Sequence, residues 1–76
     1  MKITVKLFAF LRQERFKIRD LNFPDGTTVG QVLDDLSISR QEMEIGIIFI
    51  NGKHAEFSTV LKEDDILAVF PPVAGG

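Results

Sequence analysis

The sequence predicts an α+β fold in which a mixed sheet of four to five strands carries one main helix across one face. Three observations support this fold. The chain begins with alternating apolar and polar residues, as a half-buried strand does. One short stretch, residues 28–36, has helical spacing. The run 66–70 is apolar in both phases, which is typical of a strand in the middle of a sheet. With 76 residues, the chain has room for one domain.

The first two strands form a predicted hairpin. Residues 3–7 alternate, and Phe8 and Phe10 follow in the phase of the polar residues. We therefore expect both rings on the sheet face opposite the buried one. Alternation resumes at residues 16–18 and then slips by one position, which predicts a bulge or a strand end near Arg19-Asp20.

The helix has a clear start signal. Pro24-Asp25-Gly26 has the composition of a turn. Thr28 and Gln31 then have the spacing of a capping box. The residues of the apolar stripe are Val29, Val32, Leu33 and Leu36. A helix of about two turns is marginal alone in water, so we expect it to lie on the sheet.

The second half of the chain predicts another hairpin and the last strand. Residues 37–44 are polar and irregular, whereas 45–50 form an apolar strand pattern. Asn51-Gly52 is the strongest short signal for a two-residue hairpin, with 53–55 as the return strand.

The order of elements places the first and last strands side by side. Two hairpins with a helix between them allow these strands to run parallel, because the crossover contains the helix. This is the β-grasp, or ubiquitin-like, arrangement. The predicted domain spans 1–70, and 71–76 form a flexible C-terminal Pro-Pro-Val-Ala-Gly-Gly tail.

Composition excludes several classes of site. The chain has no Cys, which excludes a disulfide, a thiolate metal site and a thiol nucleophile. A single histidine, His54, argues against a multi-histidine metal site and a serine-hydrolase triad. We therefore expect no bound metal and no bound cofactor. The net charge of −2 gives no basic surface for nucleic acid or an anionic membrane. With no signal peptide and no apolar run long enough for a membrane span, we expect a cytoplasmic protein.

The last six residues carry the candidate chemistry. Pro71 and Pro72 stop the sheet ladder because neither has an N–H group to donate. At ~3.3 Å per residue, the segment can reach about 20 Å from the sheet. Gly75 and Gly76 lack Cβ atoms, so they can pass through a narrow channel with an unhindered terminal carboxylate. The alternative is an ordinary frayed terminus.

The chain resembles the small sulfur-carrier proteins of the MoaD/ThiS family. The matching segments are Lys6-Leu7-Phe8-Ala9-Phe10-Leu11-Arg12, Asp25-Gly26-Thr27-Thr28-Val29, Leu61-Lys62-Glu63-Asp64-Asp65 and Val69-Phe70-Pro71-Pro72-Val73-Ala74-Gly75-Gly76. The Pro-Pro ending is more similar to the molybdopterin synthase small subunit. The segment 37–44 is shorter than in typical molybdopterin synthase small subunits, and the turn Ile50-Asn51-Gly52-Lys53 resembles the corresponding turn of ThiS-type proteins.

The resemblance implies a carrier rather than an enzyme. Gly76 would be adenylated by a ubiquitin-activating-type adenylyltransferase, in which ATP and Mg²⁺ act, and then converted to a thiocarboxylate. A cysteine desulfurase or a rhodanese would supply the sulfur. The acceptor would be the precursor of the molybdenum or tungsten cofactor, bound to the large subunit of molybdopterin synthase, or alternatively thiazole synthase in thiamine biosynthesis. The residues that would thread into the partner are Pro71, Pro72, Val73, Ala74 and Gly75.

Partner binding also needs a surface. Phe8, Phe10 and Phe70 are predicted to form an apolar patch on the sheet face away from the helix, and exposed apolar patches mark interfaces. The alternative for each ring is a place in the core. Two other functions stay open: a ubiquitin-like modifier joined to lysines through Gly76, and an interaction module with an idle tail.

Overall fold

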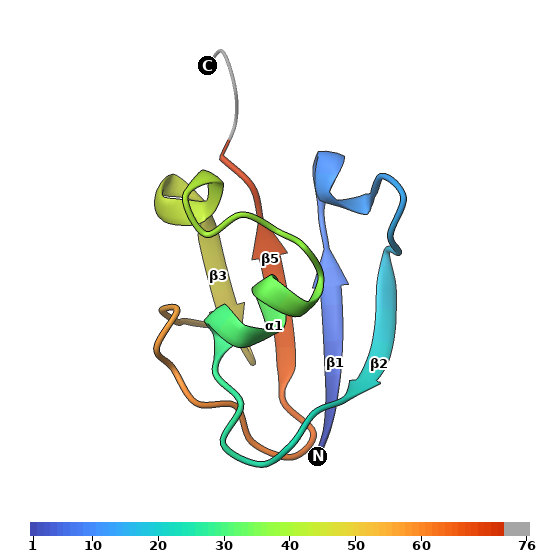
Figure 1. Ribbon diagram of the computed structural model, residues 1–76, viewed down its shortest axis with the longest axis vertical. Coiled ribbons are helices and arrows are strands. Elements are labelled where there is room, and N and C mark those ends of the chain that lie inside the picture. Colours follow the sequence, from blue (N-terminus) through green and yellow to red (C-terminus); the bar gives the residue numbers. More distant parts are fainter. Residues whose placement is uncertain (73–76) are drawn as a thin grey trace.

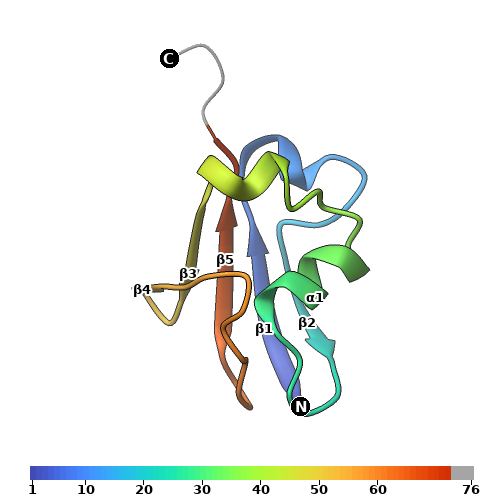
Figure 2. The same cartoon turned by 60° about the vertical axis from the view of Figure 1, so that its left-hand side comes forward.

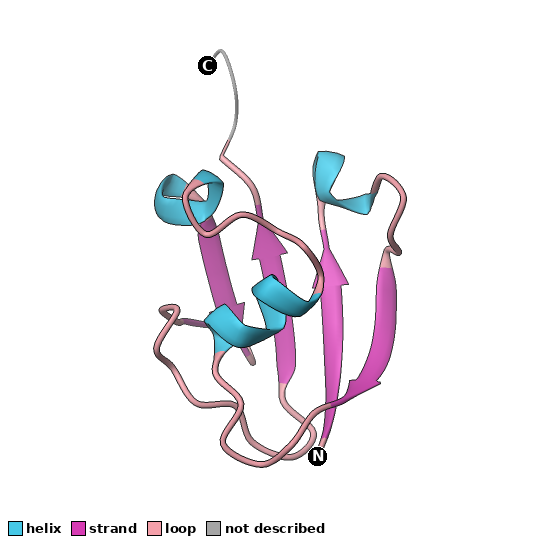
Figure 3. Ribbon diagram, viewed as in Figure 1, coloured by secondary structure: helices cyan, strands magenta, loops and turns pink. Residues whose placement is uncertain are grey.

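The computed structural model describes residues 1–72, which form a five-stranded mixed sheet with a helix across one face (Figures 1 and 3). The sheet order is β2-β1-β5-β3-β4. The elements are β1 (Lys2–Leu7), η1 (Ala9–Arg12), β2 (Ile18–Asn22), α1 (Val29–Asp35), η2 (Glu42–Ile45), β3 (Ile47–Ile50), β4 (Lys53–His54) and β5 (Ile66–Phe70), where η1 and η2 are 3₁₀ helices. The predicted β-grasp fold is confirmed.

The middle of the sheet is the parallel pair β1–β5, as the sequence predicts. Its register runs from Thr4 opposite Ile66 to Leu7 opposite Val69. On its other side β5 pairs antiparallel with β3. β5 is therefore hydrogen-bonded along both edges. Of its two apolar faces, the one with Leu67 and Val69 is buried, whereas Ile66, Ala68 and Phe70 on the other face are only partly covered. The short strand β4 lies at the edge of the sheet remote from β2 (Figure 2).

Helix α1 begins with the predicted capping box. The Thr28 hydroxyl accepts a hydrogen bond from the Gln31 backbone N–H at 3.3 Å, and the Gln31 side chain accepts one from the Thr28 N–H at 2.9 Å. The other end of α1 is held by Arg15, whose guanidinium donates to the carbonyl oxygens of Leu36 and Ser37 at 3.0 Å each. Both ends of a short helix thus have partners for backbone groups that the helix itself leaves unpaired.

The hydrophobic core lies between α1 and the sheet. Its buried members are Ile3, Val5, Leu7, Leu11, Val29, Val32, Leu33, Ile38, Met43, Ile48, Leu61, Leu67 and Val69. Two of these, Ile38 and Met43, come from the segment 37–44. The prediction of an irregular segment there missed η2.

The predicted bulge or strand end near Arg19-Asp20 is wrong. β2 pairs with β1 one residue to one, from Lys2 opposite Asn22 to Lys6 opposite Ile18. β2 is an edge strand and its side chains are mostly exposed, including Ile18 at 53%. The apolar residues of β2 therefore do not mark a buried face. The change of phase in the sequence corresponds to no irregularity in the backbone pairing of β2 with β1.

The predicted Asn-Gly hairpin joins β3 to β4. Asn51 has φ 52° and Gly52 has φ 81°, so both central residues are in the left-handed region that a type I′ turn requires. The Asn51 side chain also accepts a hydrogen bond from the Ile66 N–H at 2.9 Å, which fixes the turn against the start of β5. None of the helices in the described part of the chain has the length and apolar character needed to cross a membrane.

Candidate functional site

Three phenylalanine rings gather on the sheet face opposite α1, and we call this surface the aromatic face. Phe8 and Phe70 stack with ring centroids 4.0 Å apart and an interplanar angle of 12°. Phe49 meets Phe70 edge to face at 5.9 Å. Each ring is only half-buried. Aromatic pairs of this kind contribute about 0.5–1.5 kcal/mol beyond their buried area, so the face is ordered without being part of the core.

The aromatic face borders a shallow hollow of about 430 Å³. Aliphatic side chains extend it across the neighbouring strands, with Ala68 and Ile66 on β5 and the stem of Lys6 on β1. Ile66 is 40% exposed although it is a large apolar residue. Polar residues of the β3–β4 turn line one side. An apolar surface with a polar rim has the anatomy of a protein–protein interface.

The guanidinium of Arg12 is held beside these rings. The Arg12 guanidinium lies 5.3 Å from the centre of the Phe8 ring, within the range of a cation–π contact. Its Nε donates to the Leu7 carbonyl oxygen at 2.8 Å, which anchors it to the end of β1. A partner that covers the aromatic face therefore meets a positioned positive charge at its margin.

The position of the aromatic face follows from where β5 ends. Phe70 is the last residue of β5, and it is followed by Pro71, which is buried, and Pro72. Because proline has no N–H group, the ladder with β3 ends here. The chain leaves the sheet at the end where η1 and η2 also lie (Figure 1). The aromatic face thus reaches the point at which the predicted tail begins.

Phe10 does not join the other rings, and the prediction that placed it on their face is wrong. β1 ends at Leu7, and Ala9, with φ 53°, starts the 3₁₀ helix η1. The position of Phe10 was predicted from strand alternation, and the strand ends before Phe10 is reached. Phe10 is 46% exposed and lines a different hollow, together with Arg15 and Ile38.

Phe49 takes the third place on the aromatic face, and the sequence analysis did not single it out. Phe49 lies in β3 opposite Ala68 of β5, two residues before Phe70. Because side chains on paired strands share a face, the register of the β3–β5 pair places Phe49 beside Phe70. That register was not fixed by the sequence pattern, since residues 45–50 are apolar in nearly every position.

The remaining predicted site residues are Val73, Ala74, Gly75 and Gly76, and they lie outside the described residues. The attachment of a group at Gly76 stays a prediction. In residues 1–72 no three His, Cys, Asp or Glu side chains come together as a metal site would require. His54 is exposed, with its ring 4.7 Å from that of Phe49.

Comparison with known families gives one match that spans nearly the whole chain. The sequence model of the ThiS family matches residues 5–76. The match therefore includes both the sheet and the Pro-Pro-Val-Ala-Gly-Gly segment. None of the curated proteins matches the chain.

Solved structures share the fold along the full chain. The Haloferax volcanii HVO 2177 protein has 28% identity and a TM-score of 0.82. The alignment covers 100% of this chain and 87% of that protein's chain. The small archaeal modifier protein 1 of the same organism has 26% identity and a TM-score of 0.75. The alignment covers 95% of this chain and 98% of that protein's chain. A chain from the complex of subunits 1 and 2 of the molybdopterin-converting factor of Helicobacter pylori has 18% identity and a TM-score of 0.64, covering 100% of both.

Proposed function

Because the chain belongs to the ThiS family, we propose that it is a sulfur carrier protein whose terminal Gly76 holds the sulfur as a thiocarboxylate. The observation that carries the proposal is the ending of the sequence. A central strand is followed by Pro71-Pro72 and then by Gly75-Gly76, and the family match extends to residue 76. The chain acts as a cosubstrate, and the catalytic groups belong to its partners.

The proposed chemistry begins at the Gly76 carboxylate. A carboxylate resists attack by a nucleophile, so a ubiquitin-activating-type adenylyltransferase first joins it to AMP, with ATP and Mg²⁺ in the partner's active site. The outer sulfur of a partner's cysteine persulfide, on a cysteine desulfurase or a rhodanese, then attacks the carbonyl carbon and displaces AMP, which gives an acyl disulfide to the donor cysteine. A thiol reductant cleaves the S–S bond and is itself oxidised to a disulfide, and Gly76 keeps the sulfur as a thiocarboxylate. Gly75 and Gly76 have no Cβ atoms, which lets the terminus enter a narrow active site.

We propose the precursor of the molybdenum or tungsten cofactor as the sulfur acceptor. The support is the Phe70-Pro71-Pro72 ending, which resembles the small subunit of molybdopterin synthase, and the fold shared with a chain of the Helicobacter pylori complex. In this proposal residues 71–75 thread into the large subunit of the synthase. A thiazole synthase is the alternative acceptor, and the turn at residues 50–53 favours it.

The aromatic face is the proposed docking surface for these partners. It is apolar, and it ends at Phe70, from which the tail begins. A partner that covers Phe8 and Phe49 is therefore in place to receive the residues that follow Pro72. Phe10 lies outside this surface, in the hollow beside η1.

Intact-mass measurement tests the proposal. The chain is incubated with the adenylyltransferase of the same genome, ATP and a sulfur donor, and it should first gain AMP and then show the mass of one oxygen-to-sulfur exchange. Deleting Gly76 should abolish both products, whereas Asp35→Asn, at an exposed position of α1, should leave them unchanged. If neither an adenylate nor a thiocarboxylate forms on the parent chain, the proposal fails. If a chain lacking Gly75 and Gly76 keeps its cellular activity, the protein is an interaction module with an idle tail.

A second candidate function is a ubiquitin-like protein modifier. The likeness to small archaeal modifier protein 1 favours it, and an acyl-adenylate accepts amines as well as sulfur. Denaturing gels of cells that express a tagged chain separate the two functions. Higher-mass conjugates that disappear when Gly76 is deleted support the modifier, and their absence favours sulfur transfer alone.

A further inference from the structure

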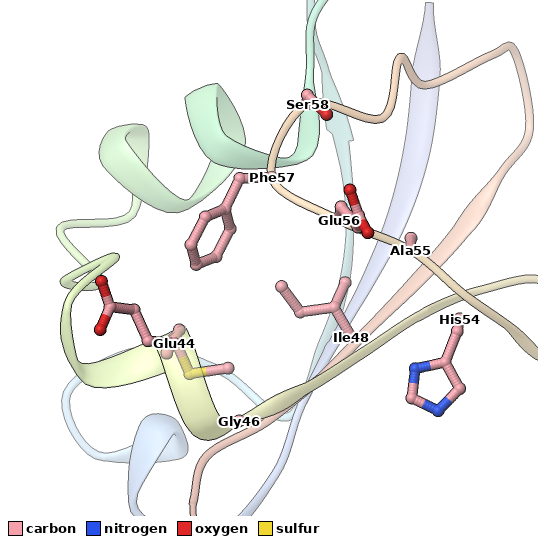
Figure 4. Close-up of a pocket in the computed structure, with 9 residues that line it drawn as sticks. Glu44, Gly46, Ile48, His54, Ala55, Glu56, Phe57 and Ser58 are labelled. Carbon is pink, nitrogen blue, oxygen red and sulfur yellow. The ribbon is translucent and has the colours of Figure 1, made fainter.

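Another hollow, of about 420 Å³, lies on the helix side of the sheet, between η2 and the loop that follows β4 (Figure 4). Met43, Ile48 and Phe57 form its apolar floor. Ile48 points to the side of β3 opposite Phe49, so this hollow and the aromatic face lie on different faces of the sheet. Its volume is within the range of about 300–1,000 Å³ that ligand pockets have.

The rim of this hollow is acidic. Glu44 and Glu56 lie on opposite sides of the apolar floor (Figure 4), and both are exposed. Neither carboxylate forms an ion pair with any group in residues 1–72. An apolar floor between two unpaired carboxylates is complementary to a group that has a long apolar stem and a positive end.

The neighbouring cations do not supply that group. Arg40 lies with its Cζ 6.0 Å from the centre of the Phe57 ring, and its guanidinium is held by both carboxylate oxygens of Asp34 at 3.1 and 2.8 Å. His54 lines the edge, but its ring lies against Phe49 on the other face of the sheet. The complementary cation must therefore come from outside these residues.

We propose that the hollow binds a lysine or arginine side chain of a partner polypeptide. Such a side chain buries its methylene stem against Met43, Ile48 and Phe57 and keeps its charge at the rim, between Glu44 and Glu56. Lysine and arginine are the residues that combine an apolar stem with a permanent positive charge. An acidic side chain is excluded by repulsion from both carboxylates.

The hollow also meets the end of the central strand. Gly46 lines it, and a Cβ atom added at Gly46 would be 2.8 Å from the carbonyl oxygen of Phe70. A partner that reaches from the aromatic face around the end of β5 can therefore place a basic side chain here. The inference depends only on the described residues and does not require that the partner transfers sulfur.

Titration of the ¹⁵N-labelled chain with short blocked peptides tests this inference. Acetyl-Leu-Lys-Leu-amide should shift the signals of Met43, Ile48 and Phe57 saturably, with a dissociation constant in the millimolar range. The norleucine peptide keeps the stem and lacks the charge, and it should bind about 3- to 10-fold more weakly, as expected for two exposed ion pairs. The corresponding glutamate peptide should not shift these signals.

Two double variants distinguish binding at this hollow from an effect of the overall charge of the protein. The double variant Glu44→Gln/Glu56→Gln should bind the lysine peptide about 3- to 10-fold more weakly than the parent chain. Glu14→Gln/Asp35→Asn removes the same charge elsewhere and should leave binding within about twofold. Ala55→Leu adds bulk to the wall and should also reduce binding, provided that its spectrum shows a folded chain.

Several results would overturn the inference. These are the absence of saturable shifts at the floor residues, equal binding of the lysine and norleucine peptides, an equal effect of the two double variants, and shifts confined to the aromatic face. Signals of the floor that move with protein concentration before any peptide is added would also overturn it, because the occupant would then be a second copy of the chain.

Discussion

Replacing Gly46 with alanine should destabilise the fold, because the added Cβ would make two close contacts. An added Cβ would lie 2.5 Å from the Met43 Cε and 2.8 Å from the Phe70 carbonyl oxygen. The Met43 Cε is the end of a flexible side chain that borders the hollow beside η2, so it can give way. The Phe70 oxygen belongs to the backbone of β5, so relief there requires β3 and β5 to shift. Overpacking of this kind costs about 1–3 kcal/mol, and each 1 kcal/mol lowers the Tm of a domain of this size by about 4–8 °C.

Gly30→Ala is the matched control. Its Cβ would also be too close to a neighbour, at 2.6 Å from the Arg40 Cζ. That atom is at the end of a flexible side chain that is 44% exposed, so it can move away. The lost Arg40–Asp34 ion pair is worth at most about 1 kcal/mol, and alanine in a helix gains a similar amount over glycine.

Urea unfolding followed by far-UV circular dichroism measures both variants. We expect Gly46→Ala to lower the free energy of unfolding by about 1–3 kcal/mol and Gly30→Ala to leave it within about 1 kcal/mol of the parent. The reasoning is refuted if Gly46→Ala falls within about 0.5 kcal/mol of the parent, the range of an uninvolved surface substitution, or if Gly30→Ala is the more damaging of the two.

Three further predictions concern the helix ends and the aromatic face. Thr28→Ala should lower the free energy of unfolding by about 1 kcal/mol in the same urea assay, whereas Thr28→Ser, which keeps the capping oxygen, should cost less than half as much. Arg15→Ala should cost about 1–2 kcal/mol, because it removes hydrogen bonds to carbonyl groups at the end of α1; full recovery by Arg15→Lys would contradict this, since lysine lacks the planar fork. In calorimetric binding to the adenylyltransferase, Phe8→Ala should weaken affinity by at least about fivefold, while Phe10→Ala should change it by less than about twofold; an equal loss would mean that the aromatic face is not the docking surface.

The elements that the sequence predicts well are those with a local chemical cause. The capping box at Thr28 and the Asn51-Gly52 turn each depend on a few adjacent residues, and both are present in the structure. The parallel pairing of β1 and β5 also followed, because the connection between hairpins contains a helix and 66–70 is apolar in both phases. Each of these features can be predicted from short segments of the sequence and the order in which they follow one another.

The features that the sequence missed depend on distant partners. Arg15 is part of a polar connection in the sequence, yet it reaches across to the carbonyl of Leu36, 21 residues later. Met43 lies in a polar stretch and becomes buried only because η2 folds it over the core. For the candidate site, Phe8 was predicted from strand phase and Phe70 from its place at the start of the tail. Strand phase does not indicate that β1 ends at Leu7 and that η1, starting at Ala9, turns Phe10 away.

The parallel arrangement of β1 and β5 has a mechanical consequence. The chain enters the sheet at Lys2 and leaves it after Phe70, and these two points lie at opposite ends of adjacent strands (Figure 1). A load applied between the N-terminus and the segment after Pro72 therefore acts along the strands. It shears all the β1–β5 hydrogen bonds together rather than opening them one at a time, and the β3–β5 ladder shares the same strand. We expect the sheet to resist mechanical unfolding when a partner protein binds the carboxyl-terminal segment and applies a pulling force to it.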